Sequence, residues 1–221
     1  MNTSHPDHVG SYAVNGEFHF YSTKRTELDR SGLQMARWLR SYDFPPGSYV
    51  LTISSQEEII HFASFEFAVQ VLGLYGTNAD DSPFDAGRVE SLSRQFSPVA
   101  IAGVSSSTLE GLKMMGHDPE KVFSGKTVWA RPDAFAAVDV MDSVSARRLC
   151  MVGPALAFEC AHGGLHIDGR EWSVSQIEGE LTISSRIDRI ERLTELPTGI
   201  KGDIHPVACT CGSSDPLILI G

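Results

Sequence analysis

The sequence predicts an α/β fold in which helices pack on a mostly parallel sheet, followed by a small β-rich region. Two observations carry this prediction. Short apolar runs alternate with amphipathic segments of helical length from Thr23 to about residue 140, and from about residue 150 the helical periodicity gives way to short strands between Gly and Asp turns. We therefore expect a loose, polar N-terminal arm at residues 1–16, an α/β domain at 17–150 and a β-rich region at 151–221.

The α/β domain is predicted to open with a helix that begins near Thr26 and ends before the turn at Pro45-Pro46-Gly47, because apolar residues recur between them at helical spacing. A second helix follows the cap formed by Ser54-Ser55, a third is expected at 84–96, and a fourth follows the cap Ser105-Ser106-Ser107. Buried strands are expected between these helices and after them, at 49–53, 74–75, 99–102, 127–129 and 136–138.

The composition excludes several classes of partner. The formal net charge is -10 and no run of Lys or Arg interrupts the acidic balance, so neither nucleic acid nor an anionic membrane surface is expected as a partner. The N-terminus has no basic stretch followed by an apolar core, and no apolar run is long enough to span a bilayer. Because 4 cysteines in 221 residues do not make a secreted disulfide scaffold, we predict a cytoplasmic protein.

The β-rich region carries an informative spacing of cysteine and histidine. Cys160 is followed six residues later by His166, and Cys209-Thr210-Cys211 comes about forty residues further on. Three thiolates and one imidazole fill a tetrahedral zinc shell and leave no position open for water, which is typical of structural zinc. On spacing alone His162 is an equally good fourth ligand, whereas Cys150 is interpreted as an ordinary strand cysteine.

Five short motifs follow one another in this region: Gly153-Pro154-Ala155-Leu156-Ala157-Phe158-Glu159-Cys160, Gly164-Leu165-His166-Ile167, Gly179-Glu180-Leu181, Gly202-Asp203 and Cys209-Thr210-Cys211-Gly212. Their order resembles the phenylacetate–CoA ligase-like branch of the adenylate-forming (AMP-binding) superfamily, and a looser likeness extends back to about residue 23. The resemblance implies a structural zinc held by Cys160, His166, Cys209 and Cys211, and so favours His166 over His162. It also implies that the carboxylate of Asp203 holds the ribose hydroxyls of a bound nucleotide.

The resemblance also indicates what the chain lacks as an adenylating enzyme. The family's phosphate loop is rich in Ser, Thr and Gly, whereas the corresponding segment here reads Gly16-Glu17-Phe18-His19-Phe20-Tyr21-Ser22-Thr23-Lys24. The family's magnesium-binding Glu is replaced by the segment 146–152, which contains no carboxylate. The sequence ends at Leu219-Ile220-Gly221, about where the family's small C-terminal ligase domain begins, so we expect that domain and its catalytic Lys to be missing. No catalytic residue is therefore assigned.

The predicted function is that of a shortened, degenerate relative of these ligases, a non-catalytic binding or partner protein in an acyl or aryl acid pathway. It is expected to bind AMP or ATP weakly and to take a small aryl or acyl acid as a ligand. Two alternatives stay open: an acid–CoA ligase subunit completed by another chain, and an enzyme of different chemistry that reuses the acyl pocket. We also expect a homodimer or a complex with a protein partner, because a shortened fold leaves sheet edge and apolar surface uncovered.

Overall fold

The computed structural model describes residues 5–205 and 207–220, which divide into two compact units. The first unit contains the described residues up to Ser41, the segment Glu57–Ala68 and the described residues from Met151 onward; the second contains Tyr42–Gln56 and Val69–Cys150. In this division the second unit ends at Cys150 and the first resumes at Met151. The division differs from the expected one at the other end of the chain, because the first helix contacts a strand of the β-rich region and belongs to the same unit.

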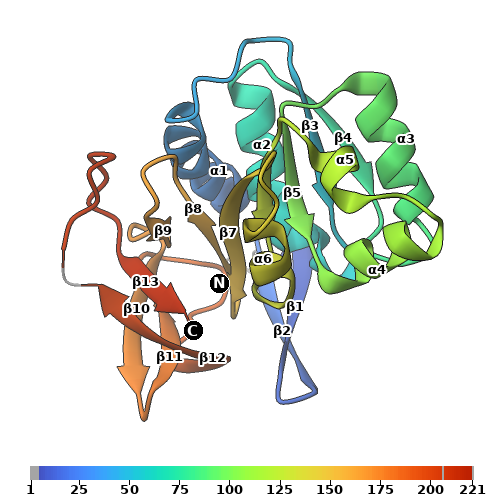
Figure 1. Ribbon diagram of the computed structural model, residues 1–221. Helices are drawn as coiled ribbons and strands as arrows, with labels where there is room; N and C mark the ends of the chain where they lie inside the picture. Colours follow the sequence, from blue (N-terminus) through green and yellow to red (C-terminus); the bar gives the residue numbers. More distant parts are fainter. Residues whose placement is uncertain (1–4, 206, 221) are drawn as a thin grey trace. The chain divides into compact units, whose positions relative to one another are not determined.

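The second unit is built on parallel strands in the order β7-β6-β5-β3-β4 (Figure 1). These strands are β3 (Tyr49–Ile53), β4 (Tyr75–Ala79), β5 (Ala100–Val104), β6 (Thr127–Ala130) and β7 (Ser145–Val152), whose last two residues are counted with the first unit. The accompanying helices are α3 (Ala86–Phe96), α4 (Ser106–Met114), α5 (Pro119–Phe123) and α6 (Pro132–Asp139). All five residues of β5 are buried, as is typical of a parallel strand with both faces covered.

The prediction of a strand at 136–138 is wrong, because these residues lie in α6. Pro132 is at the start of this helix, where a missing N–H group leaves no hydrogen bond unmade. A short apolar run such as Ala136-Ala137-Val138 is compatible with a strand and with the buried side of a helix. The proline four residues earlier is the signal that distinguishes the two.

The first unit begins with an antiparallel hairpin of β1 (His8–Val14) and β2 (Glu17–Thr23). Asn15 and Gly16 form its two-residue turn with φ of 51° and 84°, the positive values that a type I′ turn requires. The segment expected as a loose arm is thus a paired strand from His8 onward, and residues 1–4 lie outside the described part of the chain. The helical elements that follow are α1 (Arg25–Arg40), η1 (Gln56–Glu58) and α2 (Ile59–Val71), of which the last two cross the boundary between the units.

The rest of the first unit is an antiparallel sheet in the order β10-β11-β12-β13-β9-β8 (Figure 1). Its strands are β8 (Ala155–Glu159), β9 (Leu165–His166), β10 (Trp172–Ile177), β11 (Glu180–Ser185), β12 (Leu196–His205) and β13 (Leu217–Ile220).

The predicted α/β class is correct, but the prediction that the sheet is mostly parallel is wrong. Parallel pairing is confined to the second unit, and antiparallel pairs are in the majority over the described chain. The reason is the length of the connections. The strands after residue 150 are joined by eleven residues or fewer, which allows antiparallel neighbours, whereas parallel neighbours need a crossover of a dozen residues or more. Among the described helices none is both long and apolar enough to cross a membrane.

Candidate functional site

The four predicted metal ligands come together in the first unit. One ligand atom from each of Cys160, His166, Cys209 and Cys211 lies within 4.8 Å of all the others. Cys160 directly follows β8, His166 ends β9, and the other two cysteines lie in the loop between β12 and β13. His162 is exposed and is not a member of this cluster.

Two of the distances between these atoms are close to those in a tetrahedral zinc shell. Sγ of Cys160 lies 3.6 Å from Sγ of Cys209, and Sγ of Cys211 lies 3.3 Å from Nε2 of His166. Bonds of about 2.3 Å to sulfur and about 2.0 Å to nitrogen place the ligand atoms of a tetrahedron about 3.5–3.8 Å apart. A disulfide needs a sulfur–sulfur distance of about 2.05 Å, and none of the cysteines in this cluster forms one.

Burial gives the cluster a chemical preference for a cation. It raises the pKa of the Cys160 thiol to about 12, so this group needs a neighbouring positive charge to become a thiolate. Burial also lowers the pKa of His166, which keeps the imidazole neutral and able to bind a metal. The residues present therefore fit a thiolate-preferring divalent ion such as zinc.

Two tight turns hold the ligands. The backbone N–H of Cys160 donates to the carbonyl of Gly164 (2.9 Å), and that of Gly163 donates to the carbonyl of Cys160 (3.0 Å). In the second turn the N–H of Gly212 donates to the carbonyl of Cys209 (3.2 Å). Gly163 and Gly212 have φ of 83° and 81°, a left-handed conformation that glycine adopts without strain.

Gly164 has no side chain, and ligand atoms of Cys209 and His166 lie close to where its Cβ would be. A Cβ atom at this position would lie 2.7 Å from Sγ of Cys209 and 3.0 Å from Nε2 of His166. We expect Gly164→Ala to displace both ligands and to weaken metal retention by about tenfold or more, measured by competition with a chromogenic chelator. Gly76→Ala is the matched control, because its Cβ would meet only Cγ1 of Val69 at 3.9 Å. Equal retention by the two variants would contradict the ligand geometry.

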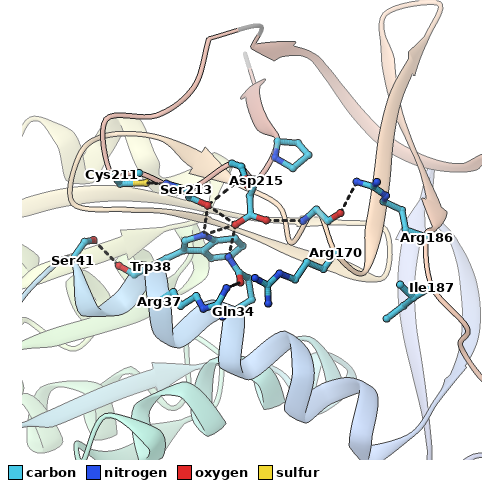
Figure 2. Close-up of a pocket in the computed structure, with 14 residues that line it drawn as sticks. Gln34, Arg37, Trp38, Ser41, Arg170, Arg186, Ile187, Cys211, Ser213 and Asp215 are labelled. Carbon is cyan, nitrogen blue, oxygen red and sulfur yellow. Dashed lines mark hydrogen bonds between the residues drawn. The ribbon is translucent and has the colours of Figure 1, made fainter.

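Trp38 of α1 supports the cluster from one side. Its ring stacks on that of His166 with centroids 5.4 Å apart and planes inclined by 18°, and its Nε1 donates to Oδ2 of Asp215 (3.0 Å). A cavity of about 680 Å³ adjoins this group of residues (Figure 2). Its walls come from residues 34–41 of α1 and its end, from 169–170 and 186–187, and from the loop residues 211–216.

The other predicted site residue lies elsewhere. Asp203 is exposed on β12, opposite Leu219 of β13, and does not line the cavity beside the cysteine cluster. Its role in binding ribose stays a prediction. Cys150 is buried in β7 and outside the metal cluster, in agreement with its interpretation as a strand cysteine.

The second unit contains a polar cluster that the sequence analysis missed. Arg131, which directly follows β6, donates through Nε to the carbonyl of Gly103 in β5 (3.0 Å) and through Nη2 to that of Ile53 at the end of β3 (3.3 Å). Its Nη1 lies 3.2 Å from Oδ2 of Asp81, which follows β4. Ser105 donates in turn to Oδ1 of Asp81 (2.5 Å). The guanidinium of Arg131 thus joins the carboxyl ends of neighbouring parallel strands.

Arg131→Ala is expected to lower the free energy of unfolding by about 2–4 kcal/mol, because it leaves the carboxylate of Asp81 nearly buried without its cation. The side chains of the pair are only 10% and 11% exposed. Chemical denaturation followed by circular dichroism measures the loss. Arg94→Ala removes an exposed pair with Glu90 in the same unit, N to O 2.9 Å, and should cost at most about 0.5 kcal/mol. A similar loss in both variants would show that the Arg131 pair is no stronger than a surface pair.

The same arrangement of elements occurs in a solved enzyme. In an open conformation with 2-HIB-AMP and CoA, 2-hydroxyisobutyryl-CoA ligase matches 99% of this chain with 57% of its own length, at a TM-score of 0.74 and 14% sequence identity. The chain shares the fold of an acid–CoA ligase. A second structure of that ligase, in the postadenylation state with R3-HIB-AMP, matches 95% of the chain with 50% of its own, at a TM-score of 0.72 and 13% identity.

The chain spans about half the length of this acid–CoA ligase, so the likeness concerns the fold of that part alone. No family model matches the sequence, and no curated protein matches it either.

Proposed function

We propose that this chain is a degenerate relative of the adenylate-forming acid–CoA ligases, from the phenylacetate–CoA ligase-like branch, that binds a ligand or partner in an acyl or aryl acid pathway and does not adenylate on its own. The observation that carries the proposal is the position of Arg131. In open parallel sheets, ligands bind outside the carboxyl ends of the strands, where the strand order reverses. That point lies between β3 and β5, and Arg131 donates to a carbonyl on each of them.

The N-terminal hairpin supports the same proposal. Residues 17–23, where the family's phosphate loop is expected, form β2 and pair along their whole length with β1. Because backbone N–H groups in a hairpin bond across it in alternation, this segment does not present a run of them to a phosphate group. Residues 146–152, where a magnesium-binding Glu is expected, lie in β7 and include no carboxylate.

Pyrophosphate exchange tests the proposal. Purified, zinc-loaded protein should give no ATP–pyrophosphate exchange above the rate without protein, with each member of a panel of aryl and acyl acids. Exchange by the chain alone would overturn the proposal. Exchange that begins only when a second protein is added would also overturn it, in favour of the alternative in which the chain is a ligase subunit completed by another chain.

The proposal assigns a structural zinc to the cluster of Cys160, His166, Cys209 and Cys211. Four protein ligands complete the tetrahedron and leave no position for a reacting water. The ion would tie the turn between β8 and β9 to the loop that precedes β13. A count of about one zinc per chain by atomic emission supports this role; a protein that folds and purifies without metal argues against it.

The proposal also includes weak binding of a nucleotide, which the resemblance to adenylate-forming ligases implies. Calorimetric titration with AMP should show binding that Asp203→Ala abolishes, since the carboxylate is assigned to the ribose hydroxyls. Asp188→Ala is the matched control, because Asp188 is also exposed and its loss changes the net charge equally. AMP binding that is equal in both variants would remove Asp203 from the proposed site.

The proposal includes a homodimer or a protein partner and a cytoplasmic location. Phe18 and Phe20 on β2 are 62% and 70% exposed. Exposed aromatic side chains of this kind favour an interface in which a second copy or a protein partner covers the hairpin. Light scattering at micromolar concentration should give a mass above that of one chain, or a pull-down should yield a stoichiometric partner. A monomer without a partner would contradict this part.

A further inference from the structure

The cavity beside the cysteine cluster has the charge of an anion site. Arg37, Arg170 and Arg186 line it, and Asp215 is the one carboxylate among its lining residues (Figure 2). The contrast with the whole chain is marked, because Asp and Glu together number 28 and Lys and Arg 18. Concave sites lined by one sign of charge concentrate ligands of the opposite sign.

None of the three guanidinium groups is paired with a carboxylate among the described residues. Arg37 donates through Nη1 to Oε1 of Gln34 (3.1 Å), and Arg186 donates through Nη1 to the carbonyl of Gly169 (2.8 Å). No described residue accepts a hydrogen bond from the side chain of Arg170, although its backbone N–H is held by Oδ1 of Asp168 (3.0 Å). Neutral acceptors thus orient two of the arginines and leave their charge uncompensated.

Asp215 forms no ion pair with these arginines, because neutral donors already bind both of its oxygens. Oδ2 accepts from Nε1 of Trp38 (3.0 Å), from Oγ of Ser213 (2.5 Å) and from Nε2 of Gln34, and Oδ1 accepts from the backbone N–H of Gly169 (3.1 Å). Gln34 therefore uses its amide nitrogen on Asp215 and its amide oxygen on Arg37. In this way Asp215 orients Gln34, and Gln34 orients the guanidinium of Arg37.

The net charge of the site stays positive when the metal cluster is counted. Three arginines contribute three positive charges, and Asp215 contributes one negative charge. A divalent ion with three thiolates and a neutral imidazole adds one more negative charge. One positive charge remains for a ligand to balance.

We infer that this cavity binds a small molecule that carries an oxyanion group, a phosphate ester or a carboxylate, and that the positive charges of Arg37, Arg170 and Arg186 along its wall attract this ligand. The planar guanidinium presents paired donors that match both kinds of oxyanion. The cavity of about 680 Å³ falls in the size range of sites for whole small molecules, so the anionic group is one end of a larger ligand. This inference does not depend on the proposed function, since it uses neither Asp203 nor Arg131.

Calorimetric titration with phenyl phosphate and, separately, with benzoate tests the inference. Neither probe contains ribose, so neither reports on the nucleotide site assigned to Asp203. We expect Arg37→Ala, Arg170→Ala and Arg186→Ala each to weaken binding by about tenfold or more, because each removes charged hydrogen bonds to the anion. Arg40→Ala is the matched control: Arg40 lies on the same helix as Arg37 and is exposed, but does not line the cavity.

Zinc content and melting temperature, measured on every variant, confirm that the fold is retained. Binding of phenyl phosphate alone identifies a phosphate ester as the ligand class, and binding of benzoate with the same dependence on the arginines identifies a carboxylate. Either result supports the inference. It is overturned if neither probe binds at millimolar concentration, or if fewer than two of the three arginine variants weaken the binding.

Discussion

Cys209→Ser is expected to release the metal and to destabilise the first unit more than any other single substitution considered. The ligands come from two segments, the turn after β8 with β9 and the loop before β13, and the ion would join side chains of both segments through metal–ligand bonds. Binding of zinc to four such ligands contributes roughly 10–16 kcal/mol to folding in small zinc domains. Because this unit also has an apolar core, we expect a smaller but still large loss of about 5 kcal/mol or more.

The measurement combines zinc per chain by atomic emission with melting temperature in the presence and absence of a chelator. The chelator should lower the melting temperature of the wild type but leave that of Cys209→Ser unchanged. Cys150→Ala is the control, because Cys150 is equally a cysteine, is buried and lies outside the cluster. It should keep its zinc and lose only about 1–2 kcal/mol. A Cys209→Ser variant with the wild-type zinc content and melting temperature would rule out the assigned ligand set.

The membership of this cluster could be predicted because its ligands lie in two short segments with a recognisable spacing. The choice between His162 and His166 could not be made on spacing alone, because both fall within a few residues of Cys160. The sheet decides it: in β9 His166 pairs with Phe158 of β8 and with Leu217 of β13, while His162 lies in the exposed turn.

The Arg131 cluster could have been predicted in part. Polar residues directly follow three buried strands, as Asp80-Asp81 after β4, Ser105 after β5 and Arg131 after β6, and the carboxyl ends of parallel strands share one edge of a sheet. Ser105-Ser106-Ser107 is typical of a helix cap, and the Oγ of Ser105 does accept from the N–H of Thr108 (3.1 Å). Its second bond, to Asp81, depends on strand order, which no local pattern specifies.

The arginine-lined cavity lay beyond sequence analysis for a different reason. Arg37, Arg170 and Arg186 come from a helix and from two separate connections between strands, and none of them is part of a continuous run of basic residues. A basic run would have indicated an anion site, but none exists. Only the antiparallel pairing of the strands after residue 150 brings such residues to one cavity, and that pairing was the part of the fold that the sequence analysis underestimated.

Arg189→Met is expected to cause the second large loss, about 3–5 kcal/mol in the free energy of unfolding. Nη1 of Arg189 lies 2.7 Å from Oε2 of Glu171, and its Nη2 lies 3.0 Å from Oε2 of Glu27. The side chains of these three residues are only 2–4% exposed. Removing the guanidinium leaves the carboxylate of Glu27 out of water without its cation, whereas Glu171 keeps its ion pair with Arg30 (2.7 Å). A buried carboxylate without its partner is far more costly than a broken surface pair.

Two comparisons separate this electrostatic cause from lost packing, since the guanidinium of Arg189 also lies 4.4 Å above the ring of Trp172. Arg25→Ala breaks an ion pair of similar length, 2.8 Å to Asp29, whose side chains are 62% and 37% exposed, and should cost at most about 0.5 kcal/mol.

The double variant Arg189→Met/Glu27→Gln gives the second comparison, because Glu27 is the carboxylate that loses its cation. If an uncompensated charge causes the loss, the double variant should be more stable than Arg189→Met alone, because it buries one carboxylate fewer. If lost contact with Trp172 causes it, the second substitution should add to the damage. Denaturant unfolding of the wild type, the two single variants and the double variant measures the coupling. A double variant more stable than Arg189→Met would assign the loss to charge.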